Sequence, residues 1–147
     1  MNKETTSKAI IGAKALVALA VLSAAIYWVT GLSSPTKNYV SMPTIIQEAE
    51  KIPPPPNAAL IEKADNHKTS AALVSSRYKT SLSSGQVFEH YRSNLAQAGW
   101  RHTKSSNSLI DEYCKGALRA EIEFNPSMQF YTFSIIWRLR VTTECES

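Results

Sequence analysis

The sequence LRAEIEFNPSMQFYTFSIIWRLRV, residues 118–141, decides the fold class. Both of its halves alternate apolar with polar or charged residues, and alternation with a period of two is typical of a strand with one buried face. Asn125-Pro126-Ser127 marks a reversal between the halves, so the stretch predicts an antiparallel pair of strands. The side chains expected in the core are Leu118, Ala120, Ile122, Phe124, Tyr131, Phe133, Ile135, Trp137, Leu139 and Val141, and those expected in water include Arg119, Glu121, Glu123, Arg138 and Arg140.

The residues before this pair predict one helix and three further strands. Residues 71–80 have the composition of a first strand, and residues 100–104 and 109–115 read as two shorter ones. Between the strands predicted over residues 71–80 and 100–104, Ser83 and Gln86 fit a capping box that begins a helix. Gly99 stands where this helix needs a left-handed C-cap. We therefore expect residues 70–147 to form an α+β domain of order β-α-β-β-β-β, with a mostly antiparallel sheet and one helix on one face.

The N-terminal region predicts a transmembrane signal anchor over residues 9–32. Residues 15–32 carry no charge and would span about 27 Å as a helix, close to the thickness of a bilayer core. Lysines precede the segment at positions 3, 8 and 14, so residues 1–8 are expected to be cytoplasmic. Cleavage after the small residues Ser23-Ala24-Ala25 is the alternative, and it would release the same domain.

Residues 33–69 are interpreted as a proline-rich extracytoplasmic linker. Pro53-Pro54-Pro55-Pro56 favours a stiff polyproline II spacer that holds the domain away from the bilayer. Within the linker, residues 39–51 could form a short helix or strand, and residues 58–66 a short helix.

The two cysteines, Cys114 and Cys145, both follow the predicted span and are expected to form a disulfide outside the cytoplasm. The bond would close a loop of about 31 residues and stabilise the domain by about 3 to 4 kcal/mol on the chain-entropy model. A reactive thiol at Cys114 beside Lys115 is the alternative.

No motif predicts a catalytic site, a metal site or a cofactor. The three histidines, His67, His90 and His102, lack the spacing of a zinc site, and the net charge of +4 supports no nucleic-acid partner. A surface for an anionic ligand, such as lipid headgroups or a glycan, is the remaining interpretation of the basic side chains. Its candidate residues are Arg77, Lys79, Arg92, Arg101, Lys104, Arg138 and Arg140.

The domain also carries a pattern made of Tyr78-Lys79-Thr80-Ser81-Leu82-Ser83, then Val87, Tyr91, Leu95 and Gly99-Trp100, then Cys114-Lys115-Gly116. Over residues 75–140 this pattern resembles small exported or membrane-anchored bacterial proteins of unassigned function. The resemblance supports the architecture. Taken with the topology predicted from residues 1–32, a bacterial origin places the chain in the inner membrane as a single-pass protein with a periplasmic domain. It brings no functional residues.

These expectations favour a membrane-anchored binding or adaptor module that contacts the bilayer through residues 9–32 and another envelope protein through its domain. One alternative is a small periplasmic hydrolase or thiol enzyme that uses His90, His102 and Cys114. An immunity-type or inhibitory protein is the other.

Overall fold

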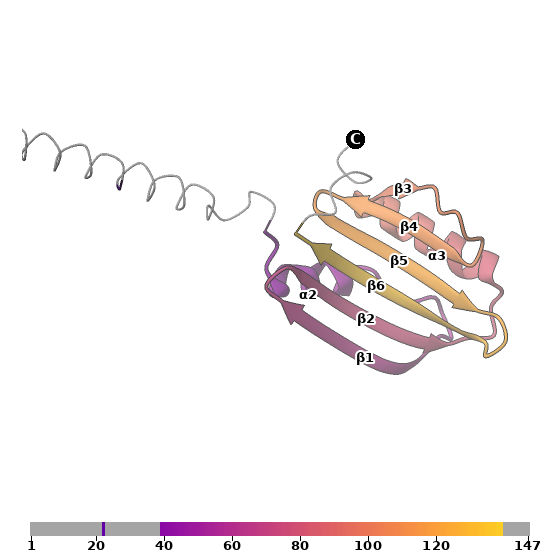
Figure 1. The fold of residues 1–147 in the computed structure, drawn as a ribbon. Helices are drawn as coiled ribbons and strands as arrows, with labels where there is room; N and C mark the ends of the chain where they lie inside the picture. Colours follow the sequence, from indigo (N-terminus) through magenta and orange to yellow (C-terminus); the bar gives the residue numbers. More distant parts are fainter. Residues whose placement is uncertain (1–21, 23–38, 140–147) are drawn as a thin grey trace, which may run out of the picture. The chain divides into compact units, whose positions relative to one another are not determined.

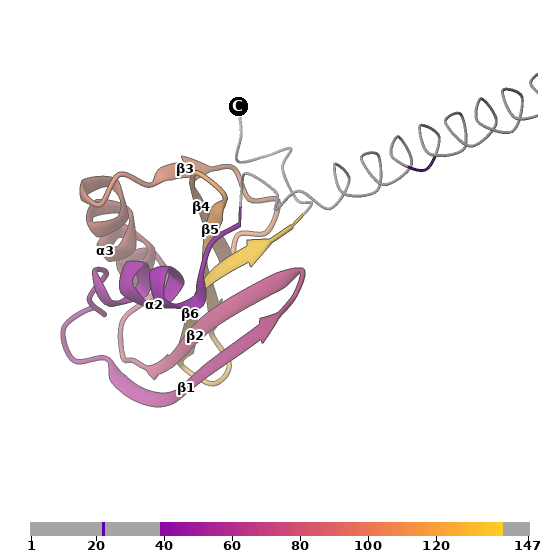
Figure 2. The same cartoon turned by 90° about the vertical axis from the view of Figure 1, so that its left-hand side faces the viewer.

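The computed structural model describes Leu22 and residues 39–139. The chain divides into two units, Met1–Lys37 and Asn38–Ser147, and the described fold belongs to the second. This unit is an α+β domain in which one antiparallel six-stranded sheet carries two helices on one face (Figures 1 and 2). The predicted α+β class is therefore confirmed, with one more strand and one more helix than the order predicted for residues 70–147.

The sheet has the order β1-β2-β6-β5-β4-β3, so the last strand of the described residues lies in the interior of the sheet. All neighbouring strands are antiparallel. In chain order the elements are α2 (Met42–Glu50), β1 (Ala59–Lys68), β2 (Ala71–Lys79), α3 (Ser84–Gln97), β3 (Arg101–Thr103), β4 (Ile110–Lys115), β5 (Leu118–Asn125) and β6 (Phe130–Arg138).

Helix α3 begins and ends as its sequence predicts. The Ser83 hydroxyl accepts a hydrogen bond from the Gln86 amide, and the Gln86 side chain accepts one from the Ser83 amide at 3.0 Å, which completes the capping box. Gly99 follows the helix with φ of 82°, a left-handed conformation that costs glycine little.

The core lies between the sheet and the two helices. Tyr91 of α3 stacks on Phe133 of β6 with ring centroids 4.9 Å apart, and it meets Tyr131 edge-on at 5.7 Å. Ile45 of α2 is fully buried in the same core. The alternation predicted for the last two strands is confirmed, because the buried strand residues include Leu118, Ala120, Ile122, Phe124, Tyr131, Phe133, Ile135 and Trp137.

The interpretation of residues 33–69 as a linker was wrong from Tyr39 onward. Residues 42–50 form α2, and residues 59–68 form strand β1 rather than the short helix expected there. The prolines connect α2 to β1 instead of forming a free spacer: Pro55 is buried, and the Pro53 carbonyl lies 3.0 Å from Nε2 of His90. Burial of Ile45 and Ile52 makes this segment part of the domain.

The predicted cytoplasmic residues 1–8 and the predicted span over residues 9–32 lie outside the described residues, apart from Leu22. Among the residues that are described, no helix is both long and apolar enough to cross a membrane.

Candidate functional site

The sheet face opposite the helices, here called the open face, carries a hollow of about 220 Å³ at one end of β1, β2 and β6. The strand register explains its position. Lys68, Ala71 and Arg138 are paired in one row across the three strands, and Asn66, Leu73 and Ile136 form the next row. Since Ala71 presents only a methyl group between two long side chains, the row is low at its centre. The hollow is lined by these six residues and Ala72.

The rim of this hollow is cationic and its floor is apolar. Lys68 and Arg138 are both exposed, and within residues 39–139 neither forms an ion pair. Leu73 and Ile136 are half-buried neighbours on adjacent strands. Among the described residues, no carboxylate lines the hollow. The arrangement suits a ligand that has an anionic group next to an apolar group.

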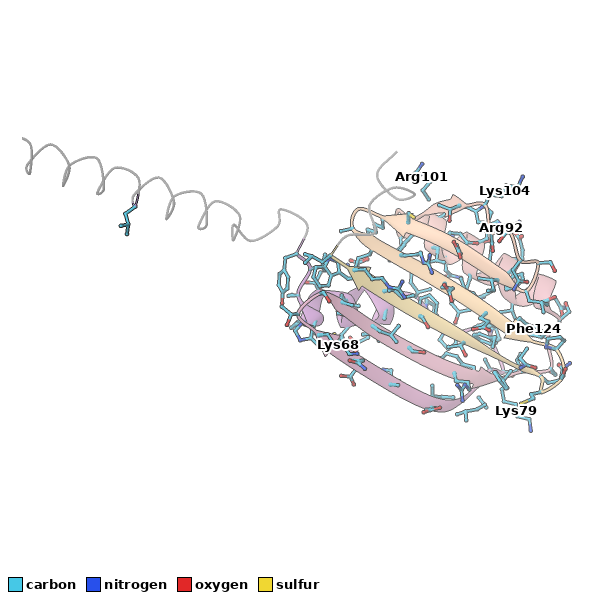
Figure 3. The ribbon with its side chains drawn as sticks, viewed as in Figure 1. Lys68, Lys79, Arg92, Arg101, Lys104 and Phe124 are labelled. Carbon is cyan, nitrogen blue, oxygen red and sulfur yellow. The ribbon has the colours of Figure 1, made fainter. Side chains whose placement is uncertain are left out.

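The basic residues predicted as one anionic-ligand surface do not lie together. Arg77 pairs with Glu62 at 3.1 Å on the open face, whereas Arg92 of α3 pairs with Glu89 at 3.2 Å. Figure 3 shows Lys68 and Lys79 at opposite ends of the sheet, with Arg101 and Lys104 beside β3. Arg138 is the member of the predicted set that lines the hollow, and Arg140 lies outside the described residues.

A polar cluster occupies the helix-facing side of β3 and β4. Nε2 of His102 lies 2.6 Å from a carboxylate oxygen of Asp111, and the Tyr113 hydroxyl donates to the other oxygen at 2.6 Å. Burial first, and then the hydrogen bond to Asp111, raises the pKa of Tyr113, so this phenol stays protonated as a donor. A hydrogen bond with Tyr113 raises the pKa of Arg92, which borders the cluster.

This cluster does not assemble the residues proposed for an enzyme. His102 is paired with Tyr113, whereas Cys114 is paired with Arg101, so the imidazole and the Cys114 side chain project from opposite faces of the sheet. His90 lies on α3 and contacts the Pro53 carbonyl and Asn94. Within residues 39–139, no serine or threonine hydroxyl is hydrogen-bonded to His102. Among the described residues, the Asp111 pair therefore orients a histidine that has no serine or threonine nucleophile beside it.

Strand β1 is the long free edge of the sheet. All ten of its residues are exposed, and Leu60 and Ile61 each keep 54 % of their surface in water. A register irregularity between Leu60 and Glu62 bends the strand where these apolar side chains lie. The opposite edge, β3, has three residues.

A second hollow, of about 260 Å³, lies between α2 and the helix-facing side of β1, β2 and β6. Its wall is mostly apolar, and its charged side chains are Glu50 and Lys63, one of each sign. It offers no convergent set of polar groups such as a specific small-molecule site requires.

Sequence reasoning missed Lys68 and Asn66 as site residues because it placed both in a linker. Their only sequence signal is a lysine just before Thr69-Ser70, where a turn joins β1 to β2. Cys114 is 4 % exposed in β4, and Cys145 lies outside the described residues, so their disulfide stays a prediction.

The described residues define a small antiparallel α+β domain with a free edge strand and an open sheet face, and they contain no group of three or more metal-ligating side chains. No protein-family model, curated protein or solved structure matches the chain. The resemblance to small exported bacterial proteins therefore stays an expectation.

Proposed function

We propose that this chain is a membrane-anchored, extracytoplasmic binding module that holds a protein of the bacterial cell envelope by adding a strand of that protein to β1. Residues 9–32 act as a single-pass anchor in the inner membrane, with residues 1–8 in the cytoplasm. The uncharged stretch over residues 15–32 and the lysines before it support this topology.

The exposure of β1 carries the proposal. An edge strand leaves half of its backbone N–H and C=O groups without a partner strand, and β1 offers this row over ten residues. A partner in extended conformation would satisfy these groups and would cover Leu60 and Ile61. Main-chain hydrogen bonds would supply affinity, and the two apolar side chains would fix the register of the partner.

The charges of β1 disfavour two of the registers in which a second copy of the chain could pair with it. Two copies paired antiparallel about Lys63 or Asp65 would set like charges opposite each other, which destabilises a strand pair. The irregularity beside Leu60 also interrupts regular pairing at that end. A partner strand with its own charge pattern avoids both penalties.

Site-specific photo-crosslinking tests this proposal in native membranes. A photoreactive residue at Ile61 of the full chain is expected to capture one defined envelope protein, because Ile61 lies on the free edge. Met128, which is 67 % exposed in the β5–β6 connection, is the matched control and is expected to capture none. Leu60→Asp should abolish the product at Ile61. Equal capture from both positions, or none from Ile61, would reject strand addition at β1.

The same experiment distinguishes the adaptor from an inhibitory or immunity-type protein, one of the alternative functions that the sequence leaves open. An inhibitory or immunity-type protein would bind through the same edge, and the identity of the captured protein distinguishes it from an adaptor. The enzyme alternative is favoured only by the His102–Asp111 pair, and that pair lacks an adjacent hydroxyl nucleophile within residues 39–139. We therefore do not propose it.

A further inference from the structure

We propose that the hollow between Lys68 and Arg138 binds the headgroup of an anionic phospholipid in the membrane that carries the anchor. This inference rests on the proposed membrane attachment, and it gives the open face a role separate from that of β1.

The two cations are placed to hold one phosphate group. Lys68 and Arg138 belong to strands on either side of β2 and are paired with the same residue, Ala71. Neighbouring strands lie about 4.8 Å apart, so their Cα atoms are separated by roughly 10 Å across the sheet. Both side chains are long enough to converge above the methyl group of Ala71. A guanidinium can bind two phosphate oxygens at once, and an ammonium adds a third donor as a point charge.

The rest of the hollow suits the remainder of a lipid better than it suits a free phosphate ion. Leu73 and Ile136 are paired neighbours in the next row and present apolar surface directly beside the cations. Asn66 adds an amide at the edge of that row. An inorganic anion would leave Leu73 and Ile136 in water, whereas the glycerol and upper acyl groups of a phospholipid would cover them.

The chain length allows this end of the sheet to meet the bilayer surface. Tyr39, the first described residue of the domain, packs edge-on against Trp137 with ring centroids 5.3 Å apart, and Trp137 directly precedes Arg138. Seven peptide steps separate Tyr39 from Leu32, the last residue of the predicted span. Fully extended, they cover at most about 25 Å. A lipid of the same bilayer is therefore the nearest source of the required chemistry.

Lysine acetylation of the full chain in lipid nanodiscs tests the inference. The chain is labelled in discs of phosphatidylcholine and in discs that also contain phosphatidylglycerol, and mass spectrometry follows Lys68 with Lys104 as an internal reference. Lys104 is exposed and lies after β3, away from the hollow. We expect phosphatidylglycerol to slow the acetylation of Lys68 several-fold relative to Lys104. Arg138→Gln should remove this protection, and Arg101→Gln, an equal change of charge on β3, should preserve it.

Each result has a distinct meaning. Equal Lys68 acetylation in both kinds of disc, with the chain incorporated, overturns the inference but leaves the anchored module intact. Equal protection by glycerol phosphate added to phosphatidylcholine discs overturns the lipid source and assigns the hollow to a soluble anion. Failure of the chain to enter discs refutes the membrane attachment, and the lipid inference with it.

Discussion

A carboxylate oxygen of Glu48 accepts a hydrogen bond from Nζ of Lys115 at 2.8 Å, although the residues are 67 positions apart in the chain. The same ammonium donates to the Ala98 carbonyl at 2.8 Å, at the end of α3. Lys51 also contacts Glu48, at 2.6 Å. Through these bonds one buried acid joins α2 to β4, and through Lys115 to the end of α3.

Glu48→Gln is expected to lower the free energy of unfolding by about 1 to 2 kcal/mol, because two charge-assisted hydrogen bonds are lost while part of their strength is screened by solvent. Glu50→Gln is the control: Glu50 is exposed on the same helix, and its change should stay within about 0.5 kcal/mol. Urea unfolding of the full chain in detergent, followed by near-ultraviolet circular dichroism, measures both. Equal losses would show that the Glu48 bonds contribute nothing.

The Glu48 carboxylate also predicts a pH dependence. Burial alone would raise its pKa, but hydrogen bonds from Lys115 and Lys51 outweigh burial and hold the pKa below the ordinary 4.5. Its contribution is therefore fully present above pH 4.5 and is lost as the pH falls through the folded-state pKa. The melting temperature of Glu48→Gln should fall less steeply than that of the parent below this pH. Parallel curves would contradict the assignment.

Ile45→Ala tests whether α2 belongs to the core. Ile45 is fully buried, so truncation should cost about 2 to 5 kcal/mol from lost burial and the remaining cavity. Its neighbour Ile46 is 37 % exposed, and Ile46→Ala should cost clearly less. Denaturant unfolding compares the two. A helix that served only as a tether would make both substitutions neutral.

Gly99→Ala should destabilise the domain by about 1 kcal/mol, because residue 99 has φ of 82° and a Cβ atom is strained there. The nearest side-chain atom to that Cβ, on Lys115, lies 4.0 Å away, so the cost is one of backbone conformation and not of a clash. Gly85→Ala lies inside α3 in open space and should instead stabilise by about 0.5 to 1 kcal/mol. Thermal melting should show shifts of opposite sign.

Peptide mapping without reductant should recover Cys114 joined to Cys145. Cys145→Ser should then lower the free energy of unfolding by about 2 to 4 kcal/mol, mainly because the unfolded chain regains the conformational entropy that the closed loop removes. Rapid thiol labelling of the denatured, unreduced chain would contradict the pairing.

The sequence predicted the strands and the helix that bury one face against the core, and it missed β1, which buries neither face. Strands β5 and β6 alternate because one side of each packs on the core, and α3 carries its own capping signals. Every residue of β1 is exposed, so no burial imposed alternation and the strand had no periodic signal. In α2 only Ile45 and Glu48 are buried, too few for the sequence to decide between the helix and the strand that were both expected over residues 39–51.

The sequence could not predict the candidate hollow, and the reason differs from that for β1. Lys68 and Arg138 are brought to one row by the register of β1, β2 and β6, which depends on pairing between distant parts of the chain. Arg138 was recognised as a solvent-facing cation, but its counterpart across β2 was not.

The position of β2 between β1 and β6 also sets the timing of folding. As the chain emerges on the outer side of the membrane, where the proposed topology places this domain, β1 and β2 can pair as a hairpin, but the other side of β2 has no neighbour until residues 130–138 have emerged. The sheet therefore closes only after almost the whole polypeptide has crossed the membrane, since the pairing of β2 with β6 joins distant parts of the chain. A chain that ended between β5 and β6 would leave the β1–β2 hairpin unjoined to the sheet of β3, β4 and β5, and each part would have an exposed edge open to aggregation.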